Sequence, residues 1–161
     1  MKKLFSLVAV IATLFTQTSR AQAQDSTKQY QLPQLLTHYY SIKNALVAGN
    51  ANDATIAATA FLKAANTIDY KIISEGNLNT LVNDAGKISK TTDINKQRAY
   101  FANFSTNMAA VAKAVKLTDK TIYYDYCPMK KAYWLSSEKA IKNPYYGSAM
   151  LACGEISETI Q

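Results

Sequence analysis

Hydrophobic residues between positions 35 and 115 recur at steps of three, four and seven, the spacing that places side chains on one face of an α-helix. The first stripe is formed by Leu35, Tyr39, Ile42 and Leu46. Pro33 suits the first turn of this helix, where its missing N–H costs nothing, and Gly49-Asn50 suits its end. The pattern predicts a helix between these two signals.

A second helix is predicted after Asn52 or Asp53, because a short side-chain oxygen accepts hydrogen bonds from the free amides of a first turn. Its inward face is expected to contain Ala57, Phe61, Ala64 and Ile68. Alanines leave little side chain between two helix backbones. We therefore expect a close helix pair along the alanines Ala57, Ala60 and Ala64.

Two further helices complete the pattern. The third begins at Asn77, although Gly86 in its interior costs about 1 kcal/mol. Its inward residues are Leu78, Leu81, Val82, Ala85 and Ile88. The fourth follows a cap at Thr92 or Asp93 and carries a heptad seam that only Gln97 breaks. The seam consists of Ile94, Phe101, Phe104, Met108, Val111 and Val115. Four such segments predict a mainly all-α fold, an antiparallel four-helix bundle.

The pattern changes after Leu117, where β-branched and aromatic residues replace the helical spacing. Residues 121–126 predict a short strand, and 132–135 can return as its β-hairpin partner. Asn143-Pro144 and Gly147 mark a turn, and residues 150–160 predict a short helix or an extended tail. This segment is expected to form a small C-terminal cap on the bundle.

The cap is rich in aromatic side chains: six of the eleven tyrosines and the single tryptophan lie between Tyr123 and Tyr146. Such a density builds either a packed cap or an exposed recognition surface, and we prefer the packed cap because buried aromatics supply large contact areas. If the surface is exposed, the residues expected to contact a protein partner are Tyr123, Tyr126, Trp134 and Tyr145.

The first 23 residues have the pattern of a secretory signal peptide. Lys2-Lys3 form a positive start, Leu4 to Phe15 an apolar stretch, and Ala21-Gln22-Ala23 a cleavage site. A membrane anchor, the alternative, needs about 20 apolar residues. We therefore expect a periplasmic or secreted protein with no membrane span after cleavage. Residues 24–31 predict a flexible arm, and 32–161 one helical-bundle domain with its cap from about residue 118.

The charge of the chain adds little to this picture. Eighteen Lys and Arg residues against eleven Asp and Glu residues give a formal net charge of +7, spread along the chain without a basic cluster. Such a distribution is typical of a solvated surface. Nucleic acid is not an expected partner.

Both cysteines lie in the predicted cap, and each has a methionine nearby: Cys127-Pro128-Met129 and Met150-Leu151-Ala152-Cys153. Thiolate and thioether sulfurs are soft donors that suit Cu(I) or a similar ion. Cys127, Met129, Met150 and Cys153 are therefore candidate ligands. Their spacing matches no strong metal signature.

A structural disulfide is the main alternative, and spacing alone favours it. In an oxidising exported compartment Cys127 and Cys153 would readily pair, stabilising the fold by roughly 3 kcal/mol. Oxidised cysteines are poor ligands, so only a reduced or redox-switching form could hold a metal tightly. A third alternative leaves two free buried thiols, with both methionines as ordinary core residues.

The C-terminal strings Tyr-Cys-Pro-Met and Asn-Pro-Tyr-Tyr-Gly, together with His-Tyr-Tyr-Ser-Ile-Lys-Asn near the start of the first helix, carry a family resemblance. Residues of about 35–160 resemble the domain of unknown function 3347, an exported helical domain of Bacteroidetes. The resemblance implies an occurrence alone behind a signal peptide or attached to adaptor proteins of copper/silver efflux systems. It therefore shifts the expectation towards metal, with Cys127, Met129, Met150 and Cys153 as ligands and efflux-system proteins as partners.

Catalysis finds little support. His38, the single imidazole, is expected to be structural, with a role as an additional soft-metal ligand as the alternative. The carboxylates are dispersed, and the chain contains neither a Gly-x-Ser-x-Gly elbow nor a Cys-x-x-Cys pair. We therefore expect a protein that is not an enzyme. Two hypotheses remain: an exported soft-metal binding module, and a structural or interaction domain stapled by a disulfide between Cys127 and Cys153.

Overall fold

The computed structural model describes the backbone of residues 18–161 and the side chains of residues 31–161. Most of the predicted signal peptide therefore lies outside the described residues, whereas the backbone of the predicted arm, residues 24–31, belongs to a helix that begins at Thr18. Residues Leu32–Gln161 form one compact unit, which contains the core and both cysteines.

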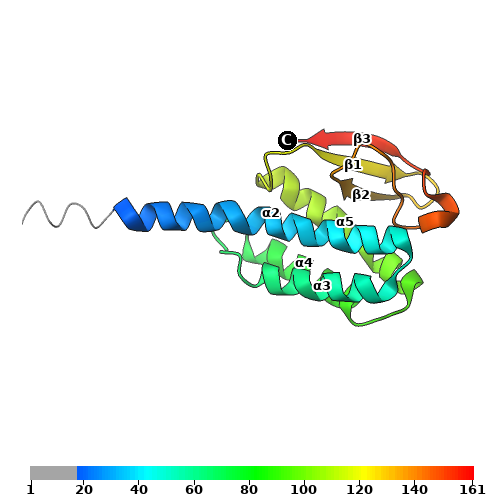
Figure 1. Ribbon diagram of the computed structural model, residues 1–161, viewed down its shortest axis with the longest axis horizontal. Helices are drawn as coiled ribbons and strands as arrows, with labels where there is room; N and C mark the ends of the chain where they lie inside the picture. The colour runs from blue at the N-terminus through cyan, green and yellow to red at the C-terminus, as the bar shows by residue number, and fades with distance from the viewer. Residues whose placement is uncertain (1–17) are drawn as a thin grey trace, which may run out of the picture. The chain divides into compact units, whose positions relative to one another are not determined.

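Four helices and a small sheet make up the described fold (Figure 1). The helices are α2 (Thr18–Ala48), α3 (Ala51–Ala65), α4 (Glu75–Ser89) and α5 (Ile94–Ala114). The strands are β1 (Ile122–Cys127), β2 (Ala132–Ser136) and β3 (Glu155–Ile160), with the short helix η1 (Gly147–Met150) before β3. All neighbouring strands are antiparallel, in the order β2-β1-β3. The mainly helical prediction and the predicted hairpin are confirmed.

Three helix starts differ from the prediction. Helix α4 begins at Glu75, after a cap at Ser74, and not at Asn77. Helix α2 begins at Thr18 and contains Pro33 in its interior. The prediction missed this start because the polar residues before Pro33 carry no periodic apolar stripe. Helix α3 is capped by Asn50, not by Asn52 or Asp53. The Asn50 side chain accepts from the Asp53 amide at 3.1 Å, and Gly49 at φ 72° ends α2 so sharply that the next helix starts at once. Asp93 caps α5 as predicted.

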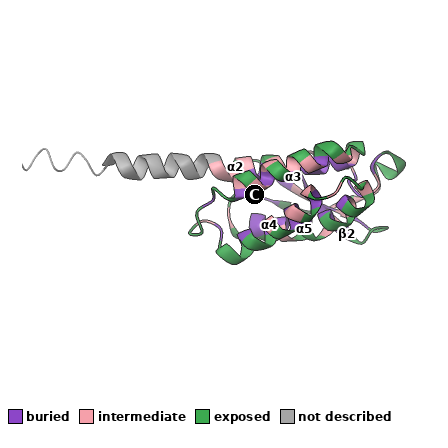
Figure 2. Cartoon of the chain, turned by 90° about the horizontal axis from the view of Figure 1, so that it is seen from below, coloured by how far each residue is buried: buried purple, intermediate pink, exposed green. Residues whose placement is uncertain are grey.

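The core lies where the helical stripes meet (Figure 2). All four residues of the first stripe are fully buried. In α3 the buried alanines are Ala54, Ala58 and Ala65, whereas Ala57 is only partly buried. The reason is that α3 has two neighbours: its buried face packs on α4, and Ala57 faces α2 across a groove.

Gln97, which breaks the seam of α5, is fully buried. Its side-chain amide donates to the carbonyls of Ala51 at 2.9 Å and Thr91 at 2.7 Å. A polar residue in the seam therefore ties the start of α3 to the connection before α5.

Tyrosine hydroxyls bind the outer edge of β2, one from α2 and one from the turn before η1. The Tyr39 hydroxyl accepts from the Leu135 amide at 2.9 Å, and the Tyr145 hydroxyl donates to the Tyr133 carbonyl. These two hydroxyls satisfy backbone groups of β2 that a further strand would otherwise bind. Trp134 is fully buried and packs edge to face on Tyr145, with ring centroids 6.0 Å apart.

The aromatic segment is therefore largely a packed cap. Trp134 and Tyr145 lie in the core and offer no surface to a partner, which corrects the alternative interpretation for these two residues. Tyr123 and Tyr126 are partly exposed. The third strand, β3, occupies the segment predicted as a short helix or a tail. It forms by pairing with β1, because its polar sequence has no clear alternation of apolar and polar residues.

Candidate functional site

The two cysteines of the chain lie side by side. Their Sγ atoms are 3.6 Å apart, and both cysteines are free thiols. Cys127 ends β1 and is fully buried, whereas Cys153 precedes β3 and is partly exposed. Because β1 and β3 are antiparallel neighbours with Tyr126 opposite Glu155, the end of one strand meets the entry to the other.

Asn143, a fully buried side chain, fixes the loop that brings Cys153 back to β1. Its Nδ2 donates to the Cys153 carbonyl at 2.7 Å, and its Oδ1 accepts from the Tyr145 amide at 2.8 Å. Its own amide donates to the Leu151 carbonyl at 2.8 Å. One residue thus holds both ends of the 143–153 loop, which is the structural role of the Asn-Pro-Tyr-Tyr-Gly string.

Arg98 and Gly154 complete this support. The Arg98 guanidinium donates to the Pro144 carbonyl at 3.1 Å and to the Leu46 carbonyl at 3.0 Å, so α5 ties the loop to the end of α2. Gly154 has φ 151°, and a Cβ there would lie 2.7 Å from the Trp134 ring. Only glycine lets the chain pass this close to the ring directly after Cys153.

The backbones of both methionines contact Cys153. Met129 is in the turn between β1 and β2, and its backbone amide faces the Cys153 thiol. Met150 ends η1, and its carbonyl accepts from the Cys153 amide at 3.1 Å. The two residues are 66% and 37% exposed. The side chains of both methionines are therefore accessible to solvent.

The thiols influence each other electrostatically. The hydrogen bond with Cys127 raises the pKa of Cys153, desolvation adds to this, and the Met129 amide acts in the opposite direction. The Cys153 thiol therefore loses its proton less readily than an isolated cysteine does.

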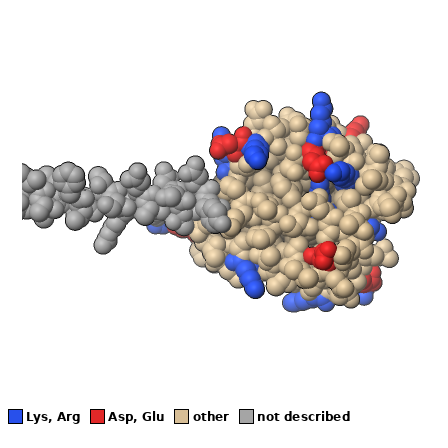
Figure 3. Space-filling model, in the orientation of Figure 1, with Lys and Arg blue, Asp and Glu red and all other residues tan. Residues whose placement is uncertain are grey.

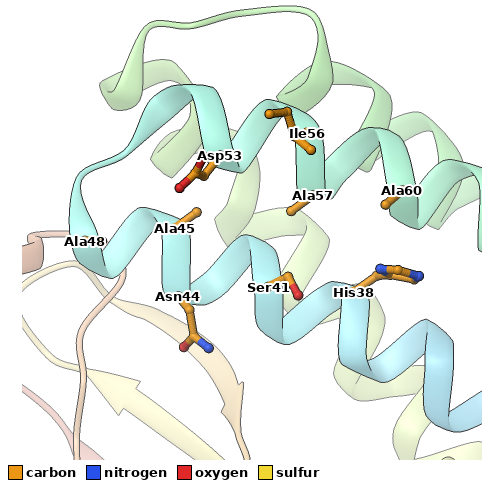
Figure 4. Close-up of a pocket in the computed structure, with 9 residues that line it drawn as sticks. All are labelled: His38, Ser41, Asn44, Ala45, Ala48, Asp53, Ile56, Ala57 and Ala60. Atoms are coloured by element: carbon orange, nitrogen blue, oxygen red, sulfur yellow. The ribbon is translucent and has the colours of Figure 1, made fainter.

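His38 lies elsewhere (Figure 4). It lines a groove of about 500 Å³ between α2 and α3, and the lining of this groove includes none of the four sulfur residues. A fifth-ligand role for His38 has no geometric support. Within residues 31–161 no three His, Cys, Asp or Glu side chains gather closely enough to hold a metal ion by themselves.

A buried polar cluster that the sequence analysis did not predict lies on the inward face of the sheet. Asp125 is fully buried, and neither carboxylate oxygen has a hydrogen-bond partner. Burial raises its pKa to about 7, while the charge of Lys43 acts against this rise. Lys43 of α2 is 1% exposed, and desolvation lowers its pKa. The indole Nε1 of Trp134, directly opposite Asp125 on β2, also lacks a partner.

A sequence signal for Asp125 did exist. A carboxylate in the middle of Tyr-Tyr-Asp-Tyr shares a strand face with Cys127, two residues further on. An inward-facing strand position predicts burial, and a buried acid is rare. The position of Asp125 in the strand therefore indicates a residue of interest.

The charged residues on the surface show no single-sign region on the face drawn in Figure 3, where Lys and Arg alternate with Asp and Glu. None of the helices in the described part of the chain is both long and apolar enough to span a membrane.

The described fold defines a small, mainly helical domain with an antiparallel three-stranded sheet at its C-terminal end. The family described as a protein of unknown function, DUF3347, matches residues 35–120, more than half of the chain. The chain belongs to this family. The matched region covers α3, α4, α5 and the part of α2 from residue 35, and it ends before β1, so the four sulfur residues lie outside it. Comparisons with curated proteins and with solved structures give no match.

Proposed function

We propose that this chain is an exported, non-catalytic domain that binds Cu(I) or a similar soft cation through Cys127, Met129, Met150 and Cys153. The observation that carries the proposal is the 3.6 Å separation of the two Sγ atoms in a corner that also holds both methionines. The helices, arranged as an antiparallel bundle, serve as the rigid support of this corner.

The separation of the sulfurs favours a bent coordination. Two sulfur ligands about 2.3 Å from a tetrahedral ion lie about 3.8 Å from each other, whereas a linear pair would lie about 4.6 Å apart. The observed 3.6 Å is close to the first value and well below the second. A bent pair of thiolates leaves room for further ligands, and the exposed thioethers of Met129 and Met150 are the sulfur donors at hand.

The chemistry of the donors favours a soft monovalent ion. Thioethers bind Cu(I) well and bind hard cations poorly, and they need no deprotonation. The exposure of Met129 and Met150 gives an entry path, since both can turn from solvent onto an ion held by the thiols. Handing the ion to efflux-system proteins is the role that we propose for a domain of this kind in the periplasm.

A disulfide-stapled interaction domain is the second candidate function. The same 3.6 Å separation favours it, because a modest movement of the Cys153 loop would bring the sulfurs to the bonding distance of about 2.05 Å. The partly exposed Tyr123 and Tyr126 would then be the aromatic residues left for a protein partner.

The test is a competition titration of the reduced protein, from residue 24 onwards, with Cu(I) and a chromogenic chelator. One equivalent of tightly bound Cu(I) is expected. The double variant Met129→Ala, Met150→Ala should lose affinity by at least tenfold if the thioethers are ligands. Leu151→Ala is the matched control, because Leu151 is 44% exposed in the same loop and has no donor atom. Equal affinities for the double variant and the wild type would remove the methionines from the site.

A further inference from the structure

We propose that the dithiol undergoes directional thiol–disulfide exchange, in which Cys153 is the entry sulfur, Cys127 is the resolving sulfur, and small disulfides are the substrate class. This inference rests on the proposed function only in one respect: closing the disulfide would release a bound soft cation.

The direction follows from the different exposure of the two sulfurs. Cys127 is 0% exposed, whereas Cys153 is partly exposed at the entry to β3. An incoming disulfide must approach the attacking sulfur along the axis of its own S–S bond, so the buried thiol is closed to it. Cys153 is therefore the sulfur that an external reagent reaches first.

The second step needs a resolving thiol within reach, and the fold supplies one. The Cys127 sulfur lies 3.6 Å from that of Cys153 before any reaction. Cys127 is held by strand pairing with Ala132, whereas Cys153 lies in a loop directly before Gly154. Cys153 is therefore the residue that moves when the disulfide forms.

The exchange balances without a further reactant. The Cys153 thiolate attacks a disulfide, forming a mixed disulfide and releasing one thiolate of the substrate. The Cys127 thiolate then attacks the Cys153 sulfur of the mixed disulfide and releases the second thiolate. The domain loses two electrons and two protons, and the substrate gains both, becoming two thiols. With both thiolates consumed, the soft-cation site loses its anionic ligands.

The experiment uses oxidised glutathione as the probe and intact mass as the readout. The reduced wild type is expected to lose two hydrogens and to retain no glutathione. Cys127→Ser should trap one glutathionyl group on Cys153. Cys153→Ser, which leaves only the buried thiol, should react at least tenfold more slowly. Equal rates for the two single-cysteine variants would overturn the assigned direction, and a wild type that retains the glutathione adduct would overturn the resolving role of Cys127.

Two controls keep the outcome interpretable. Cys127→Ala repeats the trapping experiment with a smaller apolar residue in case the buried serine hydroxyl disturbs folding, and thermal unfolding confirms that each variant is folded. The Cu(I) titration of the fully reduced wild type is a separate measurement. A protein that exchanges directionally without binding Cu(I) refutes the proposed function alone, and one that binds Cu(I) with equal reactivity at both cysteines refutes the exchange alone.

Discussion

Replacing Asp125 by asparagine should stabilise the domain at pH 8 and remove much of the pH dependence of its stability. The carboxylate is fully buried, has no hydrogen-bond partner, and has a pKa raised from 3.8 to about 7 by burial. Asparagine has nearly the same shape and carries no charge, so the substitution removes the cost of ionising the side chain in the interior, together with its smaller attraction to Lys43.

The magnitude follows from linkage. A folded-state pKa above the unfolded value means that the folded protein keeps its proton longer. Stability is then fully present below about pH 4, falls as the pH rises towards about 7, and changes little above that. The pKa of Asp125 is about three higher in the folded than in the unfolded protein, and this difference corresponds to roughly 4 kcal/mol of unfolding free energy lost at pH 8. The raised pKa already includes the opposing effect of the Lys43 charge.

Urea denaturation of the reduced protein at pH 4.5 and pH 8 measures this difference. The stability of the wild type relative to Asp125→Asn should fall by a few kcal/mol between the two pH values. Asp119→Asn is the matched control, because its side chain is 88% exposed and should shift both values by little. Parallel pH profiles for the wild type and Asp125→Asn would refute the reasoning.

Two further predictions concern the support of the dithiol, and a third concerns an exposed ion pair. Asn143→Ala should cost about 2–4 kcal/mol and weaken Cu(I) binding, because it leaves the Cys153 carbonyl and two amides without their partner; chemical denaturation and the chelator titration check this. Gly154→Ala should lower the midpoint of thermal unfolding by several degrees, since its Cβ would meet the Trp134 ring at 2.7 Å; an unchanged midpoint contradicts this. Lys113→Ala, which breaks an exposed ion pair, should change the unfolding free energy by less than about 1 kcal/mol, as chemical denaturation would measure.

The helical part of the fold could be predicted because its signals are local. The Leu35-to-Leu46 stripe and the Asp93 cap follow directly from residue spacing and side-chain chemistry, and the structure confirms both. The face of α3 was less well predicted. A helix with two neighbours buries parts of two faces, and a single stripe does not show how they divide.

The sheet and the polar cluster depend on contacts between distant segments. β3 is stabilised by pairing with β1 rather than by its own alternation, so the sequence left its conformation open. Lys43 lies next to a recognised stripe residue, Ile42, yet its full burial requires the sheet to cover it. The pairing of Cys127 and Cys153 was an expectation from chemistry, and Asn143 and Gly154 show how the chain achieves the proximity.

X-ray absorption at the copper edge, on the reduced protein loaded with one equivalent of Cu(I), examines the central claim most directly. A first shell of sulfur atoms alone, with more than two sulfurs in the wild type and fewer when Met129 and Met150 are both alanine, is the predicted result. A shell dominated by nitrogen or oxygen, or a spectrum unchanged by removal of both cysteines, would contradict it.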